Sequence, residues 1–372
     1  MDVFDVPRVQ VEDLSEDIVR TNFNDGTEFN EYLSNYFKDI ASRDLYIVSG
    51  VTDIEGQSNF SSAIQEQGWD VEEDYGAVLK IGQDYGDHRA QAYLYYNPDN
   101  QLFFLYTDQR KTEEIDNSII PLLEDLESAH YLYISPRTLR QVVDMIAEEE
   151  EAAEVTEFVA KRNEGTKIDS EERPDVERTI NYYADDGLKT LREVGEKYGV
   201  LPHILEISIP DKITFRVNKE GVFKLVSGSL DFLFQYIEEC IEQTLSIKDA
   251  YDSTAIEPVE ITQGYTVSQS IPARIELTQP MTHDELKPLK SNLKEEDYAL
   301  IDSHSQRGSV YFTSKIYDSE NNIFFNVRAD EEAIRVFPRD EKNISTFFRF
   351  FEVIQSTLDD RAEPATVDIQ AS

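Results

Sequence analysis

Residues 213–248 read ITFRVNKEGVFKLVSGSLDFLFQYIEECIEQTLSIK, and this stretch decides the fold. From Ser227 onward it predicts an amphipathic helix, because apolar residues recur at i, i+3, i+4 and i+7. The residues on this stripe are Leu230, Leu233, Phe234, Ile237, Cys240, Ile241, Thr244 and Leu245. Before the helix, Ile213, Phe215 and Val217 alternate with polar residues, and a turn at residues 218–221 leads into the second strand at 222–226, which predicts a β-hairpin. We expect the helix to cover one face of that hairpin.

The N-terminal end of this helix and its single cysteine support the predicted start of the helix and its buried face. Ser229 stands where an N-terminal cap is expected, and Asp231 places a negative charge where the helix dipole favours one. Cys240 lies on the apolar stripe, so we interpret it as a small buried hydrophobe. It is the only cysteine of the chain. No intramolecular disulfide can form, which is compatible with a reducing cytoplasm.

The order of hairpin and then helix recurs near residues 90–126 and 309–358. These units predict an α+β fold of antiparallel hairpin-plus-helix units, with a mixed sheet at the N-terminus. Two explanations stay open, since unrelated α+β domains often use this order and an internal duplication would also produce it. Matching residues at fixed offsets are few, which favours the first explanation.

The length of 372 residues predicts two or three domains. Residues 165–174 are polar and end in proline, which is typical of a linker. We therefore predict an N-terminal α+β domain over 1–164 and a C-terminal α+β domain over 175–358. The second domain has a possible subdivision near residue 250. Residues 359–372 are expected to form a flexible tail.

Local patterns predict the remaining elements. Residues 44–71 indicate a βαβ-like piece, and helices are expected from Gly26 and from Pro136. A kinked or split helix follows Thr112, since Pro121 interrupts its pattern. A weaker helical period continues past Glu148. Two short helices are predicted over 175–184 and 186–198, a capping box at Thr282 and Glu285, and a last helix capped by Asp340.

The chain carries 75 acidic and 35 basic residues, for a formal net charge of −40. The acidic residues are spread evenly, and 20 Phe and 20 Tyr exclude a disordered acidic chain. Uniform acidity favours a salt-adapted, halophilic protein of an archaeal cytoplasm, because molar salt screens the repulsion. A nucleic-acid mimic is the alternative, and it should concentrate its charge on one face.

The N-terminus lacks a basic segment followed by an apolar run, and no stretch approaches 18 continuous apolar residues. We therefore expect a soluble, cytoplasmic protein with no membrane partner.

The common sequence motifs of catalysis and cofactor binding are absent. There is no phosphate-binding glycine loop, no Gly-x-Ser-x-Gly elbow and no His or Cys pair at metal-ligand spacing. The segment from Asp318 to Asn322 mimics the start of a calcium loop. Ile323 stands where that loop needs glycine, so a hairpin turn is predicted. The sequence therefore indicates no cofactor and no metal site, and an enzyme is the less favoured interpretation.

The best catalytic candidates surround the first predicted strand. Asp44 precedes it, and Asp53 and Glu55 follow it, where carboxylates often hold Mg²⁺. The run Val-Ser-Gly-x-x-Asp, with a helix and a Gly-x-x-Val strand entry after it, resembles the second half of NYN/PIN-type nuclease domains over about 30 residues. This resemblance implies a Mg²⁺-dependent nuclease or phosphoesterase that uses Asp53 and Glu55.

A tyrosine-rich group of predicted strands offers a second functional hypothesis. It contains Tyr93, Tyr95, Tyr96, Tyr106, Tyr131 and Tyr133. They could form an exposed stacking surface, but packing within the sheet is favoured. There is no basic patch, although molar salt makes such a patch less necessary and nucleic acid is not excluded. The favoured hypothesis is a non-catalytic protein- or nucleic-acid-interaction module with an unknown protein partner.

Overall fold

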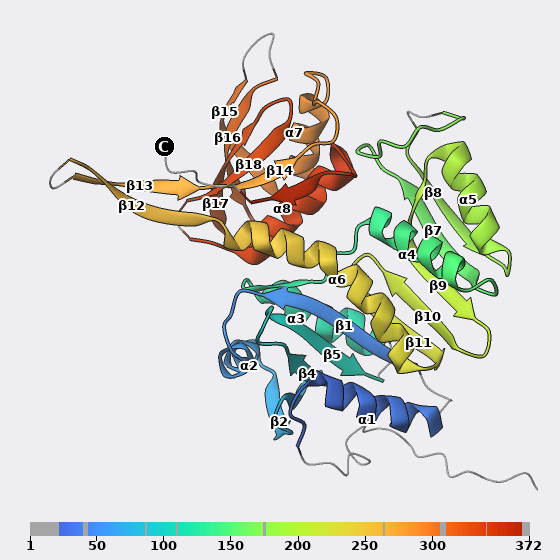
Figure 1. Cartoon of the computed structure of the whole chain (residues 1–372). Coiled ribbons are helices and arrows are strands. Elements are labelled where there is room, and N and C mark those ends of the chain that lie inside the picture. The colour runs from blue at the N-terminus through green and yellow to red at the C-terminus, as the bar shows by residue number, and fades with distance from the viewer. Residues whose placement is uncertain are drawn as a thin grey trace, which may run out of the picture.

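The computed structural model describes residues 22–39, 44–85, 88–108, 111–173, 176–262, 265–305, 310–339 and 341–366. Within these ranges the chain forms an eleven-stranded sheet, a six-stranded sheet and a two-stranded hairpin, with helices packed on both larger sheets (Figure 1). The predicted α+β class is confirmed. No helix of the described part is long and apolar enough to cross a membrane.

The large sheet contains strands from both halves of the chain. In order across the sheet, its strands are β2 (Asp70–Asp74), β3 (Val78–Tyr85), β4 (His88–Tyr96), β5 (Leu102–Thr107), β1 (Leu45–Thr52), β11 (Val222–Gly228), β10 (Ile213–Asn218), β9 (Leu201–Ile209), β7 (Glu154–Arg162) and β8 (Arg178–Tyr183). A short strand, β6 (Ala129–Tyr131), also pairs with β1. All neighbouring named strands are antiparallel, so the predicted mixed sheet is wrong. The predicted strand–helix–strand order over residues 44–71 is present as β1, α2 (Gln57–Glu66) and β2, but β2 pairs with β3 and not with β1.

Helices cover the two faces of this sheet, and the strand residues alternate between them. One group is α1 (Gly26–Asp39), α4 (Pro136–Glu149) and α6 (Leu230–Asp252), and the other is α2 (Gln57–Glu66), the π-helix η1 (Lys111–Ile119) and α3 (Ile120–Asp125). In β1, Leu45 and Ile47 pack with the first group, whereas Tyr46 and Val48 pack with the second. This alternation of buried residues is the period of two expected for a strand covered on both sides. A further helix, α5 (Gly187–Tyr198), packs against β7.

Helix α6 connects the two larger sheets, as Figure 1 shows in yellow. It packs against β10, α1, α4 and α8 (Ile344–Thr357), so the predicted covering of the hairpin is confirmed. Leu233, Ile237 and Cys240 on its stripe are buried. Ser229 stands at the N-terminal cap position, but its side chain makes no capping hydrogen bond.

The C-terminal part is built on the smaller sheet. Its strands in order are β15 (Tyr298–Ser305), β16 (Phe312–Asp318), β17 (Ile323–Ala329), β18 (Ala333–Pro338), β14 (Ala273–Glu276) and β19 (Glu363–Ala365). Helices α7 (Leu286–Glu295) and α8 pack on one face, where Phe348, Phe351 and Ile354 are buried. The hairpin of β12 (Ala255–Thr262) and β13 (Tyr265–Ile271) precedes this sheet.

Several local predictions are wrong. The helix expected over 175–184 is strand β8, and the helical period past Glu148 is strand β7. Strand β9 was not predicted at all. The cap of α8 is Asn343, whose Oδ1 accepts from the backbone N of Thr346 at 2.8 Å. Asp340 lies outside the described residues. The split predicted at Pro121 is confirmed, because η1 gives way to α3 there.

The predicted linker connects two neighbouring strands of the large sheet, β7 and β8. Its first residues pack against the end of α8. Gly165 N donates to the carbonyl oxygen of Ser356 at 2.8 Å, and Lys167 N donates to Oδ1 of Asp360 at 2.7 Å. The division into two domains at this segment stays a prediction. The two explanations of the recurring hairpin-plus-helix order both stay open, and β18 separates the third hairpin from its helix.

Candidate functional site

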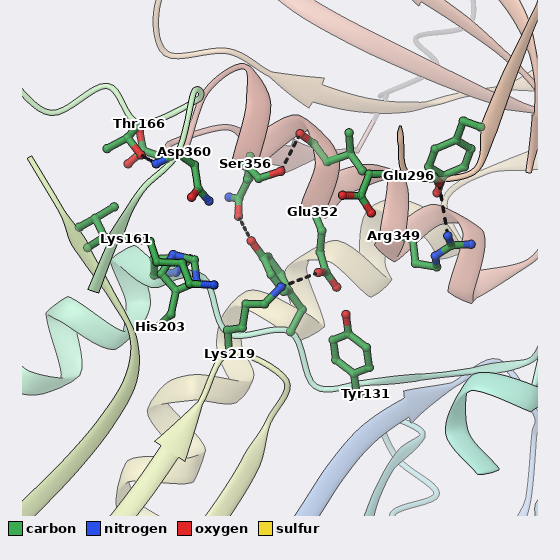
Figure 2. Close-up of a pocket in the computed structure, with 17 residues that line it drawn as sticks. Tyr131, Lys161, Thr166, His203, Lys219, Glu296, Arg349, Glu352, Ser356 and Asp360 are labelled. Carbon is green, nitrogen blue, oxygen red and sulfur yellow. Dashed lines mark hydrogen bonds and ion pairs between the residues drawn. The ribbon is translucent and has the colours of Figure 1, made fainter. Parts of the chain in front are cut away.

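A polar cavity of about 210 Å³ lies where three parts of the chain meet. Strands β7 and β9 and the β10–β11 turn contribute one wall, and β6 and α8 contribute the facing wall, on the side of the smaller sheet. Figure 2 shows the labelled side chains of Lys161, His203 and Lys219 grouped together, with Glu352 and Arg349 beyond them on α8.

The first wall is cationic, and strand register explains its composition. Lys161 of β7 pairs with Leu201 of β9, and His203 follows Leu201 by two residues, so all three point to the same side. The backbone N of Lys219 donates to the carbonyl oxygen of His203 at 3.1 Å, which fixes the turn beside that strand. The side chain of Lys161 forms no hydrogen bond and no ion pair with any described residue.

His203 is the side chain of this wall whose hydrogen-bonding capacity is least used. It is only 8% exposed, and its Nδ1 is buried without a hydrogen-bond partner. Burial, together with the charges of Lys219 and Lys161, lowers the pKa of His203 to about 3. The imidazole is therefore neutral at physiological pH. Because buried polar atoms are normally hydrogen-bonded, this nitrogen is available to bond a polar group of a ligand.

The facing wall is centred on Glu352 of α8. Its carboxylate lies 3.7 Å from Nζ of Lys219 and 3.6 Å from Nε2 of His130. Burial raises the pKa of Glu352, and Lys219 offsets part of that rise. Burial lowers the pKa of His130 to about 3, so this histidine is neutral and its contact with Glu352 is not an ion pair at physiological pH.

The hydroxyl of Tyr131 belongs to the same wall. Burial raises its pKa, and the charge of Glu352 adds to the rise, so the hydroxyl stays protonated and can donate to that carboxylate. The pKa of Lys219 is raised, because the neighbouring carboxylates, Glu352 foremost, outweigh the lowering caused by burial. Lys219 is therefore an ammonium.

Two other charged side chains at the cavity, Arg349 and Asp360, have ion-pair partners. Arg349 makes ion pairs with Asp318, at 3.0 Å, and with Glu320. Asp360 lies 2.5 Å from Nε of Arg137. Among the described residues at the cavity, Lys161 is consequently the cation without a carboxylate partner. An unpaired ammonium beside an unsatisfied imidazole can hold an anionic group by charge-assisted hydrogen bonds.

The carboxylates predicted from the sequence lie elsewhere. Asp44 and Asp53 stand at opposite ends of β1, roughly 30 Å apart along an extended strand. Asp44 forms an ion pair with Lys224 at 2.8 Å. The Oδ2 of Asp53 accepts a hydrogen bond from the hydroxyl of Tyr251 at 2.7 Å, and Glu55 is exposed. In the described ranges, no group of three or more His, Cys, Asp or Glu side chains could hold a metal ion. A catalytic role for these carboxylates stays a prediction.

The tyrosine-rich strands pack within the molecule. Tyr93, Tyr96, Tyr106 and Tyr133 are buried, as the packing interpretation expected.

The residues that line the cavity were not predicted from the sequence, because they come from distant positions along the chain. One signal was available, since His203 alternates in phase with the apolar Leu201 and Leu205 in β9, which predicts an inward-facing imidazole.

Comparison with known proteins covers one part of the cavity lining with a family model. A model described as the AF_0896_M family middle domain matches residues 138–220. A protein of Archaeoglobus fulgidus, named "Uncharacterized protein", is 22% identical over 355 residues, which cover 91% of this chain and 95% of that protein. The chain is thus similar to an archaeal protein over most of its length, and Lys161, His203 and Lys219 all fall within the matched family domain.

Proposed function

We propose that the protein is a non-catalytic binding module whose cavity takes a small anionic ligand, a carboxylate or a phosphate ester. The observation that carries the proposal is the buried, unpartnered Nδ1 of His203 beside the unpaired ammonium of Lys161. A carboxylate or phosphate oxygen can accept from the protonated nitrogen of a neutral imidazole and from an ammonium at once. Lys219 adds a second positive charge on the same side.

The size of the cavity limits the ligand. Its volume of about 210 Å³ is below the range of about 300–1,000 Å³ that is typical of pockets for drug-sized molecules. The side opposite the cationic wall offers Glu352 and the hydroxyl of Tyr131, which can accept and donate hydrogen bonds. We therefore propose a compact ligand with an anionic end and a polar, uncharged or cationic end.

The position of the cavity supports a role in regulated interaction. A bound ligand would contact β7, β9, the β10–β11 turn and α8, and so would join the large sheet to the C-terminal part. A ligand that binds one arrangement of these parts better than another shifts the population toward it. We propose that an unknown protein partner binds preferentially to this arrangement. The net charge of −40 supports the proposal that the protein is adapted to a cytoplasm with molar salt.

No comparable observation favours the Mg²⁺-dependent alternative. Asp53 is engaged by Tyr251, and burial raises the pKa of Asp53, which disfavours the charged form that a divalent cation needs. The hydrogen bond from Tyr251 offsets only part of that rise.

The proposal is tested by calorimetry and thermal unfolding of the full chain with inorganic phosphate, glycerol 3-phosphate, acetate and citrate. The titrations use the lowest KCl concentration at which circular dichroism shows a folded protein. We expect at least one of these anions to bind with 1:1 stoichiometry and to raise the unfolding temperature. Lys161→Ala should weaken binding by about tenfold or more, because a charge-assisted hydrogen bond contributes about 1.5–3 kcal/mol.

Lys189→Ala is the matched control, since it removes an exposed ammonium from α5 that does not line the cavity. It should leave the affinity unchanged within about twofold. Binding of no anion in the set, or equal losses in Lys161→Ala and Lys189→Ala, would overturn the proposal.

A further inference from the structure

The face of the smaller sheet that α7 and α8 leave uncovered carries an unusual group of side chains. Strand register places Arg274, Arg335 and Arg328 side by side on three neighbouring strands, followed by Thr313 and His304 on the next two. The row crosses five strands and spans about 19 Å. A residue of the next row, Lys315, lies on the same face.

This concentration of positive charge contrasts with the rest of the molecule. The chain carries a net charge of −40, yet four cations gather on one sheet face. Directly opposed like charges destabilise a sheet. Arg335 is balanced by Asp330 at 2.5 Å and Arg274 by Glu276 at 3.3 Å. Arg328 is exposed and forms no ion pair with a described residue, so this face can accept an anionic partner.

Aromatic rings alternate with these cations. Nζ of Lys315 lies 3.9 Å from the ring centre of Phe324, and the guanidinium of Arg328 lies 5.0 Å from that of Phe337. Tyr317 packs beside Phe324 with ring centroids 4.8 Å apart. All three rings are only partly buried. In many proteins that bind single strands, bases stack on such rings while nearby cations contact the phosphates.

The shape of the face fits an extended ligand. A shallow depression of about 660 Å³ is lined by Lys315, Asn326, Arg328 and Phe337, together with His304 and Tyr311. Tyr311 and Ile301 are two of the four large hydrophobic side chains that are exposed in the described ranges, and both lie at this end of the sheet. Helix α6 packs against β14 and β19 at one edge of this sheet, whereas Lys315 and Arg328 lie on β16 and β17, toward the other edge.

We infer that the open face of the C-terminal sheet binds single-stranded nucleic acid, through stacking on Phe324, Tyr317 and Phe337 and phosphate contacts to Lys315 and Arg328. An acidic protein segment would satisfy the cations but would leave the aromatic rings unused, so the rings favour nucleic acid. The open sheet face is a different surface from the cavity. Binding of nucleic acid to this face therefore does not depend on the ligand proposed for the cavity.

The experiment is fluorescence anisotropy of the full chain with labelled single-stranded RNA and DNA of about 12 nucleotides and with a duplex of the same length. It is carried out over a range of KCl concentrations from the lowest at which the protein stays folded. We expect saturable binding of a single strand, weaker binding of the duplex, and a loss of affinity with salt. Comparison of the affinities for RNA and DNA shows whether the protein prefers ribose or deoxyribose.

Two double variants with the same change of charge make the test specific. K315A/R328A should weaken single-strand binding by about tenfold or more and lower the slope of log affinity against log salt by about 1.4, since each phosphate contact contributes about 0.7. K189A/K287A removes two exposed lysines elsewhere and should change affinity by less than about twofold.

A third variant separates stacking from charge. F324L/F337L keeps every charge and should still weaken binding by about tenfold, because stacking contributes a large part of single-strand affinity. Absence of single-strand binding by the folded wild type would overturn the inference. Equal losses in the two charge variants would also overturn it, and so would specific capture of an acidic peptide with no oligonucleotide binding.

Discussion

Nζ of Lys219, in the turn between β10 and β11, lies 3.7 Å from the Glu352 carboxylate on α8. This contact joins the hairpin that begins the fold-determining stretch to the last helix of the chain. It also sets the charge state of the cavity, because Lys219 offsets part of the rise in the pKa of Glu352 that burial causes. The Lys219 side chain is 33% exposed and the Glu352 side chain 14% exposed, so water screens the pair only partly.

Removal of this lysine charge should destabilise the protein. Lys219→Met keeps most of the stem but leaves Glu352 buried without its ammonium. We expect the free energy of unfolding to fall by about 1–2 kcal/mol, below the 3–5 kcal/mol typical of fully buried pairs. Urea unfolding at neutral pH measures this change. The double variant Lys219→Met/Glu352→Gln should recover part of the loss, and a double variant no more stable than the single one would contradict this account of the contact.

The two buried histidines predict a dependence of stability on pH. An unfolded histidine takes up a proton below about pH 6.5, whereas folded His203 and His130, each with a pKa of about 3, do not. The unfolded state therefore binds more protons in this window, and stability falls as the pH falls from about 6.5 toward 3. Each histidine should cost about 1.4 kcal/mol between about pH 7.5 and about pH 5.5.

The contribution of one histidine can be isolated with His203→Gln. Buried carboxylates with raised pKa values, such as Glu352, act in the opposite direction, so the informative quantity is the difference between wild type and variant. Urea unfolding at both pH values should show the variant losing about 1.4 kcal/mol less than the wild type. An identical loss in both proteins would show that His203 is not held neutral.

The start of the predicted linker should be sensitive to a single methyl group. A Cβ on Gly165 would lie 2.7 Å from the backbone oxygen of Gln355 and 2.7 Å from the backbone nitrogen of Leu358. Gly165→Ala should therefore lower the free energy of unfolding by about 1–3 kcal/mol through overpacking. Thermal unfolding compares it with Glu171→Ala, an exposed position of the same segment. Equal stability of both variants would mean that the segment does not pack on α8.

Helical periodicity identified the centre of the fold because it is a local property. The stripe of α6 needed no knowledge of its neighbours, and Leu233, Ile237 and Cys240 are buried as predicted. Strands depend on their partners, and here the sequence was less informative. β8 pairs only with β7 at the edge of the sheet, and its residues alternate between half-buried and exposed. A polar edge strand of this kind has no strong pattern that distinguishes it from a short helix.

The candidate sites could not be predicted because each is assembled from distant strands. Lys161, Lys219 and Glu352 lie on three elements, and only tertiary packing brings them to one cavity. The cationic sheet face was missed for the same reason, since Arg274, Lys315, Arg328 and Arg335 are isolated in the sequence. No two of these basic residues are adjacent in the sequence, so the sequence shows no basic patch. The antiparallel register of the strands brings them side by side on the sheet.

The acidic surface predicts a strong response to salt. With a net charge of −40, self-repulsion should be large in dilute buffer and mostly screened at about 1 M salt, where the Debye length is about 3 Å. The unfolding temperature, followed by circular dichroism, should rise between low and molar KCl. Sucrose at matched viscosity is the control, since it stabilises by exclusion without screening charge. An unfolding temperature that does not change with KCl would remove the support for salt adaptation.

The predicted division at residues 165–174 can be tested by producing the two fragments. Separate folding of residues 1–164 would support the two-domain prediction. The sheet suggests a different result, because β1 pairs with β11 and β7 pairs with β8 and β9, so each fragment would expose unpaired strand edges. We expect each fragment alone to aggregate or to lack cooperative unfolding, and the two to form a stable complex when co-expressed. Size-exclusion chromatography and thermal unfolding distinguish these outcomes, with the full chain as the reference.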